Sequence, residues 1–176
     1  MKTHKLIILS FSFFLILTSS CNTSDNSTVD FTQWKLDNDT YFSNMKDSTA
    51  YVLYNLPIAR GGSSFYYKIT TQGNQISGSP TSTDSVKVNY RGRLINGSIF
   101  DQNYLGSLPS SSAKPITFKL SKLIGGWQEN LIHMKAGEVR TIVLPHELGY
   151  GVYGYGSIPP FSTLVFDIQL VSFTGE

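Results

Sequence analysis

Apolar and polar residues alternate along three stretches of the chain, at 86–91, 116–120 and 162–173. A repeat of two places every second side chain on the same face, which is typical of a strand with one buried face. Two further stretches, 64–72 and 139–144, are rich in aromatic and β-branched residues and also predict strands.

An Asn96-Gly97 pair interrupts the apolar positions after the first of these strands. Leu94 and Ile95 precede it, and apolar residues resume at 99–100. Asn-Gly is the commonest two-residue loop between antiparallel strands, so we expect a second strand through Leu94 and Ile95 that turns back at this pair.

The spacing changes to that of a helix at 124–134, where apolar residues recur every three or four positions, and Gly137 stands where a helix would stop. A weaker helical pattern runs through 31–46. Because Asp37 and Asn38 are poor helix formers, we expect one or two short helices there.

Together these segments predict an α+β domain: an antiparallel sheet of five or six strands with one short helix across it. We assign this domain to 63–176. A small, partly helical N-terminal extension covers 31–62, and 21–30 is polar and predicts a flexible tether.

The first twenty residues have the pattern of a secretory signal. Basic residues precede an apolar core at 6–17, which is too short to span a membrane. The core leads into "LTSSC", and Cys21 is the only cysteine in the chain. This arrangement resembles a bacterial lipobox and predicts cleavage before Cys21 and lipid on its sulfur. The alternative is an ordinary signal peptide, 1–20, followed by an incidental cysteine.

The charge balance gives no support for nucleic-acid binding. The chain has 14 basic and 12 acidic residues, and loss of Lys2 and Lys5 with the signal peptide leaves 12 of each. A nucleic-acid-binding surface needs an excess of basic residues, so we expect no such partner.

Gly149, Gly151 and Gly154 match the spacing of a dinucleotide-binding loop. A true phosphate loop opens a helix, whereas Pro159-Pro160 follows this one and directs the chain into an extended segment. The sequence therefore predicts no nucleotide site here.

The chain also lacks the residue sets of hydrolases. His133 and His146 stand apart, and no metal-binding histidine pair or nucleophile elbow is present in the sequence, so we expect no metal and no cofactor. Rotation about an X–Pro bond needs none of these groups, because no bond breaks across its barrier of about 18–20 kcal/mol. An apolar aromatic pocket with a few fixed donors would suffice.

Three segments resemble the FKBP-type peptidyl-prolyl cis–trans isomerases, the macrolide-binding immunophilins: "VKVNYRGRLINGSIFD", "ITFKLSKLIGGWQENLIHMKAGEVRTIVLP" and "GYGVYGYGSIPPFSTLVFDIQL". The resemblance covers about 64–173 with the segments in the family's order. With the lipobox, the whole resembles a lipoprotein isomerase of bacterial envelopes, of the Bacteroidetes type.

The resemblance implies an FKBP-like fold and a set of catalytic residues. Trp127 would form the pocket floor, with aromatic walls around it. The Tyr150 hydroxyl would donate a hydrogen bond from a flap over the pocket. Asp101 would orient its neighbours and polarise the carbonyl region. The full catalytic set is Tyr90, Phe100, Asp101, Trp127, Tyr150 and Phe166.

Substrate-binding residues follow from the same resemblance. The Ile124 backbone N–H would donate to a substrate carbonyl, and Ile158 would add an apolar contact from the flap. One wall position that is often aromatic falls on Ile116, or on Phe118 in a shifted register. The set is Ile116, Phe118, Leu123, Ile124, Tyr155 and Ile158.

The partners implied are proline-containing polypeptides, macrolide inhibitors, and a membrane held through the N-terminal lipid, with the protein facing the periplasm or the cell surface. Dimerisation is left open. Two alternatives to an isomerase stay open as well: a catalytically weak FKBP-fold chaperone or peptide-binding module, and a pocket for an unrelated small ligand.

Overall fold

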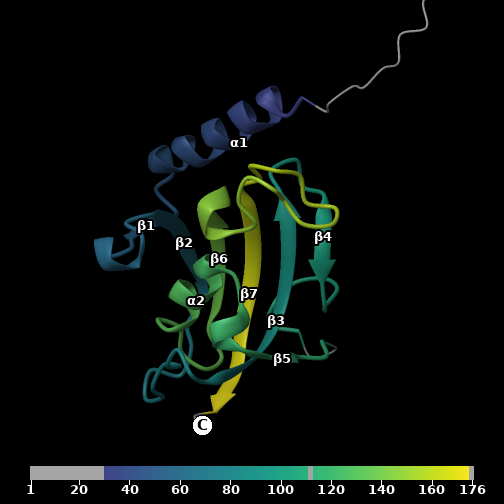
Figure 1. The fold of residues 1–176 in the computed structure, drawn as a ribbon. Helices are drawn as coiled ribbons and strands as arrows, with labels where there is room; N and C mark the ends of the chain where they lie inside the picture. Colours follow the sequence, from purple (N-terminus) through teal and green to yellow (C-terminus); the bar gives the residue numbers. More distant parts are fainter. Residues whose placement is uncertain (1–29, 111–112, 175–176) are drawn as a thin grey trace, which may run out of the picture.

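Two long strands, β3 (Ser85–Leu94) and β7 (Leu164–Thr174), pair antiparallel and form the middle of the sheet. The computed structural model describes residues 30–110 and 113–174. Its antiparallel sheet has seven strands in the order β1-β2-β6-β7-β3-β4, and β5 also pairs with β3 (Figure 1). The other strands are β1 (Val52–Asn55), β2 (Ser64–Thr71), β4 (Ile99–Gln102), β5 (Ile116–Lys119) and β6 (Val139–Leu144).

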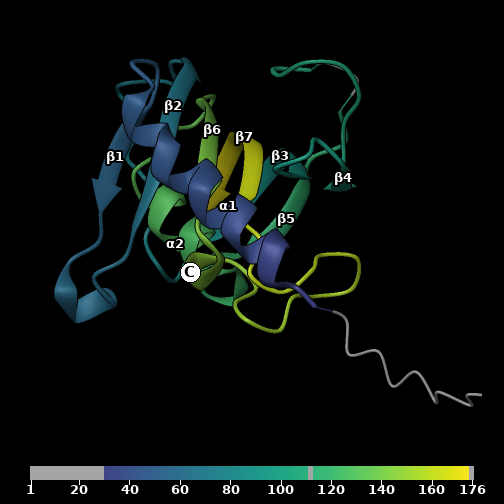
Figure 2. The ribbon, with the colours of Figure 1, turned by 90° about the horizontal axis from the view of Figure 1, so that it is seen from above.

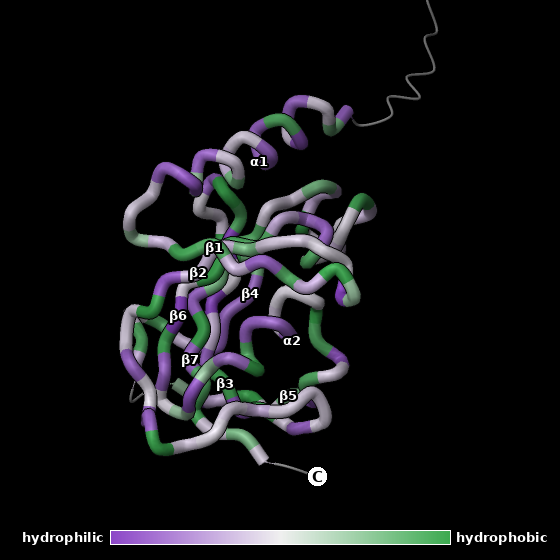
Figure 3. The backbone as a smooth tube through the Cα atoms, turned by 90° about the vertical axis from the view of Figure 1, so that its left-hand side faces the viewer, coloured by the Kyte–Doolittle hydropathy of each residue, from purple (hydrophilic) through white to green (hydrophobic). Residues whose placement is uncertain are grey.

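Helix α2 (Gly125–Leu131) lies against one face of this sheet, so the predicted α+β class is confirmed. Hydrophobic and polar residues alternate along β3, and Figure 3 shows that the strands of the sheet carry residues of both kinds. The side chains that face α2 form the main core. Its fully buried members include Phe65, Leu120, Leu131, Met134, Ile142, Leu144, Leu164, Ile168 and Leu170.

Two local predictions were wrong. The segments expected as separate strands before Asn96 are one strand, β3, and the turn follows it, with the Gly97 N–H donating to the Leu94 carbonyl at 2.9 Å. The helix ends at Leu131, well before Gly137. Gly137 has a φ of 84° and donates its N–H to the Leu170 carbonyl, so it belongs to the turn into β6.

The N-terminal extension contributes both a helix and a strand. The expected short helices are one helix, α1 (Thr32–Asn44), followed by a 3-10 turn at Met45–Asp47, and β1 adds a seventh strand at the sheet edge. Helix α1 lies across the end of the sheet where β7 begins (Figures 1 and 2). Phe42 packs edge-on against Tyr66, whose neighbour Phe65 faces the main core, so α1 covers part of the opposite face.

The signal peptide, Cys21 and nearly all of the tether at 21–30 lie outside the described residues. Across 30–110 and 113–174, no helix has the length and apolar character needed to cross a membrane.

Helix α2 approaches the sheet closely because its second residue is glycine. A Cβ placed on Gly126 would lie 2.5 Å from both Leu144 methyl carbons, closer than a carbon contact allows. A Cβ on the neighbouring Gly125 would meet nothing nearer than Leu148 Cδ2 at 3.7 Å. The two adjacent glycines therefore differ: one sets the helix–sheet distance and the other does not.

We expect Gly126→Ala to lower the free energy of unfolding by about 1–3 kcal/mol, because the added methyl group overpacks the contact with Leu144. Gly125→Ala is the matched control and should leave stability unchanged or raise it, since alanine favours the helix. Urea unfolding followed by circular dichroism measures both. Equal effects of the two substitutions would contradict this account.

Candidate active site

A cavity of about 310 Å³ opens between α2, the sheet edge formed by β3, β4 and β5, and the loop 149–160, which we call the flap. Most of its walls are aromatic, and its charged groups are one carboxylate and one lysine. The lining residues are Tyr90, Phe100, Asp101, Phe118, Lys122, Leu123, Ile124, Trp127, Tyr150, Tyr155 and Phe166.

Trp127 lies at the bottom of this pocket and is 4% exposed. Three rings surround it at close to right angles: Tyr90 at 5.2 Å and 82°, Phe166 at 5.3 Å and 86°, and Phe118 at 6.4 Å and 89° between ring centroids and planes. Edge-to-face packing of this kind is the favoured geometry of aromatic pairs. The indole therefore has a fixed plane, with upright rings as walls around it.

Phe100 closes the wall next to Phe166, at 5.5 Å and 86° between the rings. Both rings lie over Gly92, near the C-terminal end of β3. A Cβ there would come within 2.4 Å of Phe100 and 2.7 Å of Phe166, so only glycine leaves room for the two rings. Sequence reasoning missed this residue, although a glycine inside a strand pattern is a known signal of close approach.

Tyr90 and Asp101 form the polar edge of the pocket. The Tyr90 hydroxyl donates to Asp101 Oδ2 at 2.6 Å. Burial raises the pKa of Tyr90 well above its ordinary value, and the hydrogen bond to the Asp101 carboxylate and its negative charge raise it further. The hydroxyl thus stays protonated and holds the carboxylate in one orientation.

The flap brings two more tyrosines to the pocket. The rings of Tyr150 and Tyr155 stack at 5.2 Å with 15° between their planes. Burial, and then the charge of Asp101, raise the pKa of Tyr150, so its hydroxyl is a donor at neutral pH. Tyr155 and Ile158 join their backbones by two hydrogen bonds of 2.9 Å, which fold the flap tip into a tight loop.

Most of the predicted pocket residues meet in this one cavity, and the two exceptions are both isoleucines. Ile116 is 39% exposed and lies outside the lining. It shares a strand face with Phe118 but lies about 6.5 Å further along β5, so Phe118 supplies the aromatic wall. Ile158 is 5% exposed and lines an adjoining cavity beside Tyr150 and Tyr155 instead. Lys122 lines the pocket and was not predicted.

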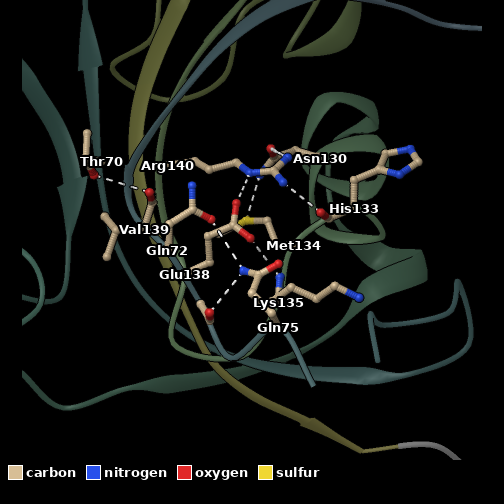
Figure 4. Close-up of polar contacts among 11 residues, drawn as sticks. Thr70, Gln72, Gln75, Asn130, His133, Met134, Lys135, Glu138, Val139 and Arg140 are labelled. Carbon is tan, nitrogen blue, oxygen red and sulfur yellow. Dashed lines mark hydrogen bonds and ion pairs between the residues drawn. The ribbon is translucent and has the colours of Figure 1, made fainter. Parts of the chain in front are cut away.

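A buried ion pair holds the far end of α2 (Figure 4). Arg140 of β6 donates to the His133 carbonyl at 2.6 Å and to Asn130 Oδ1 at 3.3 Å, and its Nε binds the Glu138 carboxylate. The same carboxylate accepts the Lys135 backbone N–H at 3.0 Å. These bonds fix the residues after Trp127 to the sheet, and no local sequence pattern predicted them.

The pocket lining supplies apolar contacts, hydrogen bonds and the charges of Asp101 and Lys122. In the described part of the chain, no three His, Cys, Asp or Glu side chains gather in a way that could hold a metal ion. The space fits a small apolar ring. Tyr150 is part of the lining, so its hydroxyl can donate a hydrogen bond to a carbonyl of a bound molecule. The site is suited to gripping a substrate and excluding water from it.

A family profile described as FKBP-type peptidyl-prolyl cis-trans isomerase matches residues 77–171. Peptidyl-prolyl cis-trans isomerase Mip of Coxiella burnetii is 43% identical over 107 residues, which are 60% of this chain and 43% of that protein. FKBP-type peptidyl-prolyl cis-trans isomerase FkpA of Escherichia coli is 44% identical over 92 residues, which are 52% of this chain and 32% of that protein. The chain thus spans less than half the length of either relative.

Solved structures of the same class of enzyme resemble this one. The crystal structure of FkpA from Escherichia coli has a TM-score of 0.65 at 31% identity and covers 81% of this chain and 62% of its own. A peptidyl-prolyl cis-trans isomerase from Pseudomonas syringae has a TM-score of 0.66 at 28% identity. The match covers 83% of this chain and 97% of that one.

Replacing Asp101 should change the titration of Tyr90 in a defined direction. Asp101→Asn removes the negative charge that opposes ionisation of the hydroxyl, so the pKa of Tyr90 should fall toward the value of about 10 of a free tyrosine. It should remain above that value, because burial is the larger cause. Nuclear magnetic resonance of ring-labelled tyrosine measures the midpoint. Asp39→Asn on exposed α1 is the control, and an unchanged Tyr90 midpoint in Asp101→Asn would refute the coupling.

Proposed function

The chain belongs to the FKBP-type peptidyl-prolyl cis–trans isomerase family, and on that basis we propose that it catalyses rotation about X–Pro bonds in exported or envelope proteins. X–Pro isomerisation takes tens to hundreds of seconds without a catalyst and can limit the rate of folding. The protein would shorten this step and so assist folding. Its substrates are polypeptides that contain proline.

The proposed mechanism is selective binding of the twisted amide. Rotation breaks the conjugation between the amide nitrogen and its carbonyl, and the barrier of about 18–20 kcal/mol is the cost of that loss. A site that binds the twisted form more tightly than either planar form lowers the barrier by the difference. Such a site needs no nucleophile and no general base.

In this pocket the proline ring would lie on the Trp127 indole, beside the wall that the rings of Phe166 and Phe100 form together. The Tyr150 hydroxyl and the Ile124 backbone N–H would donate to carbonyls beside the proline and hold the chain on each side of the rotating bond. Asp101, held by Tyr90, would polarise the substrate carbonyl groups beside the proline through its negative charge. The apolar walls exclude water, which strengthens these polar contacts.

One observation carries the proposal: the indole plane of Trp127 is fixed by three nearly perpendicular rings inside an open cavity. A catalytically weak chaperone or peptide-binding module would also use an apolar cavity. It would not need the adjoining Tyr90–Asp101 pair, whose hydroxyl and carboxylate are held 2.6 Å apart at the pocket edge. This pair favours the isomerase over that alternative.

We expect Phe100→Ala and Trp127→Ala each to lower kcat/KM for a proline-containing peptide by about tenfold or more, equivalent to about 1.4 kcal/mol of lost transition-state binding. Each removes a surface that grips the ring. Ile58→Ala, which changes a 93% exposed side chain of a 3-10 turn, is the control. A protease-coupled or exchange-based isomerisation assay measures all four proteins.

One outcome of that assay distinguishes the functions. Wild-type protein no faster than buffer would overturn the isomerase and leave the binding module. Because Trp127 is buried, circular dichroism must first establish that Trp127→Ala is folded. The half-buried Phe100 provides the independent test, since its loss disturbs the core less.

We further propose that the mature protein is anchored to a bacterial membrane by lipid on Cys21 and faces the periplasm or the cell surface. The order of basic residues, apolar core and "LTSSC" supports this location. One lipid group alone binds membranes reversibly, so stable anchoring would use more than one chain. Macrolides are proposed as inhibitors, from family membership alone.

Cys21→Ser should abolish incorporation of labelled fatty acid when the full chain is expressed in a bacterium, because serine offers no thiol for the lipid. The protein should also leave the washed membrane fraction. Ser20→Ala is the control and should remain labelled. Wild-type protein that is exported, unlabelled and soluble would show that the segment is an ordinary signal peptide.

A further inference from the structure

Helix α1, which lies outside the segment matched by the family profile, is joined by hydrogen bonds to the residues that follow the flap. Asn38 is fully buried, and its Oδ1 accepts the Thr163 backbone N–H at 2.7 Å. The Asn38 carbonyl accepts the Thr163 hydroxyl at 3.2 Å. Its Nδ2 donates to the Trp34 carbonyl one turn earlier at 2.7 Å, which fixes the side chain.

A second contact reaches into the flap itself. The Trp34 Nε1 donates to Ser162 Oγ at 3.1 Å, and the Ser162 hydroxyl donates to the Pro159 carbonyl at 2.7 Å. Trp34 and Asn38 are four residues apart and so lie on the same side of the helix. One face of α1 thus binds Ser162 and Thr163, and Pro159 through Ser162. In Figures 1 and 2 the helix lies across the end of the sheet at which β7 begins.

From these residues the contacts continue to the pocket. Ile158 precedes Pro159 and is bonded to Tyr155 at the flap tip, and Tyr155 stacks on Tyr150. The Phe161 N–H donates to the Gly151 carbonyl at 3.0 Å. This bond ties the first limb of the flap, 149–153, to the second limb, which we take as 157–161 so that it includes the residue just after the flap. The position of the second limb therefore sets where the two pocket tyrosines lie.

Phe161 shows that the second limb is held in an unusual conformation. It is the non-glycine residue with a positive φ, 60°, among those the structure describes. A phenylalanine adopts this region rarely and only where its surroundings impose it. Its ring contacts His146 at 5.5 Å and lies under the Lys35 ammonium of α1 at 5.7 Å, so α1 contributes to these surroundings.

The composition of α1 fits attachment to the flap better than general burial. Its one fully buried residue is Asn38, a poor helix former that an ordinary packing helix would replace with an apolar residue. A buried asparagine is favourable only where its amide groups are hydrogen-bonded, as they are here. The side chain at this position is therefore explained by its bond to Thr163.

We propose that α1 is a clamp that positions the flap, and that Asn38 and Trp34 are positioning residues which act on catalysis through Tyr150 and Tyr155. This inference rests on the proposed isomerase function for its effect on catalysis, but the clamp itself is a property of the fold. Without it, the flap would sample orientations in which its tyrosines leave the pocket.

The test uses full-length protein with Asn38→Ala and, separately, Trp34→Phe, which keeps an aromatic ring but removes the N–H donor together with part of the indole. Gln33→Ala is the matched control: it lies on the same helix, and its side chain bonds only to Asp37 at the surface. Hydrogen exchange of backbone amides is measured at 151–158 and in β3 and β7. Isomerisation kinetics give kcat and KM.

In Asn38→Ala we expect exchange at 151–158 to rise about tenfold or more while β3 and β7 keep their protection, because the flap opens without the sheet unfolding. Trp34→Phe should show a smaller rise. KM should increase about threefold or more with a lesser change in kcat, because the flap contacts the substrate chain in both amide geometries. Gln33→Ala should match the wild type.

Flap exchange equal to the control in both variants would overturn the clamp, and a loss of thermal stability alone would show that α1 is only a structural cover. If Asn38→Ala does not fold, Trp34→Phe decides the question. A wild-type protein without isomerase activity would overturn the proposed function, whereas the exchange measurement would still decide the clamp.

Discussion

The close contact between α2 and β6 is the constraint on which the pocket depends. Gly126 lets the helix approach until it touches Leu144, and the next residue, Trp127, is thereby carried to the depth at which it meets the walls. Arg140 holds the other end of the same helix by bonds to Asn130 and to the chain just beyond it. A buried arginine is tolerable only with its charge compensated, and Glu138, the residue just before β6, supplies that compensation. A shift of α2 away from the sheet would separate the indole from the rings that fix its plane.

The distance between α2 and the sheet also governs the electrostatics of the site. Once the rings close around Trp127, the polar groups remain at the edge of the cavity, where Tyr90 holds Asp101 and the flap contributes Tyr150. Both hydroxyls are donors because burial and the Asp101 charge keep them protonated. A dry pocket with fixed donors suits a reaction in which charge is redistributed within an amide and no proton is transferred. The charge of Asp101 matters most where water is excluded, so packing and electrostatics act on the same step.

Local sequence patterns predicted the sheet because they depend on which face of an element is buried, whereas the pocket residues followed from the resemblance to the FKBP family. The resemblance did not decide between Ile116 and Phe118, which share one face of β5, and only Phe118 lines the pocket. The close approach of two rings to Gly92 was predictable in principle, because a glycine within a strand pattern signals such an approach. Asn38 and the Arg140 contacts were not, because their partners lie on other elements, and for Asn38 the partner is Thr163 at the far end of the chain. Periodicity records burial, whereas these residues are explained by hydrogen bonds that exist only after folding.

The flap is the part of the site least supported by the sheet, and this explains why α1 matters to it. The pocket floor and walls stand on α2 and on hydrogen-bonded strands, whereas Tyr150 and Tyr155 stand on a loop with glycines at 149, 151, 154 and 156. Such a loop has a large conformational freedom to lose on closing over a substrate. Contacts that restrict it in advance reduce that loss, and Pro159-Pro160 does so within the loop itself. Helix α1 acts from outside through Ser162 and Thr163, so a segment beyond the matched family region adjusts the one wall of the pocket that the sheet does not hold.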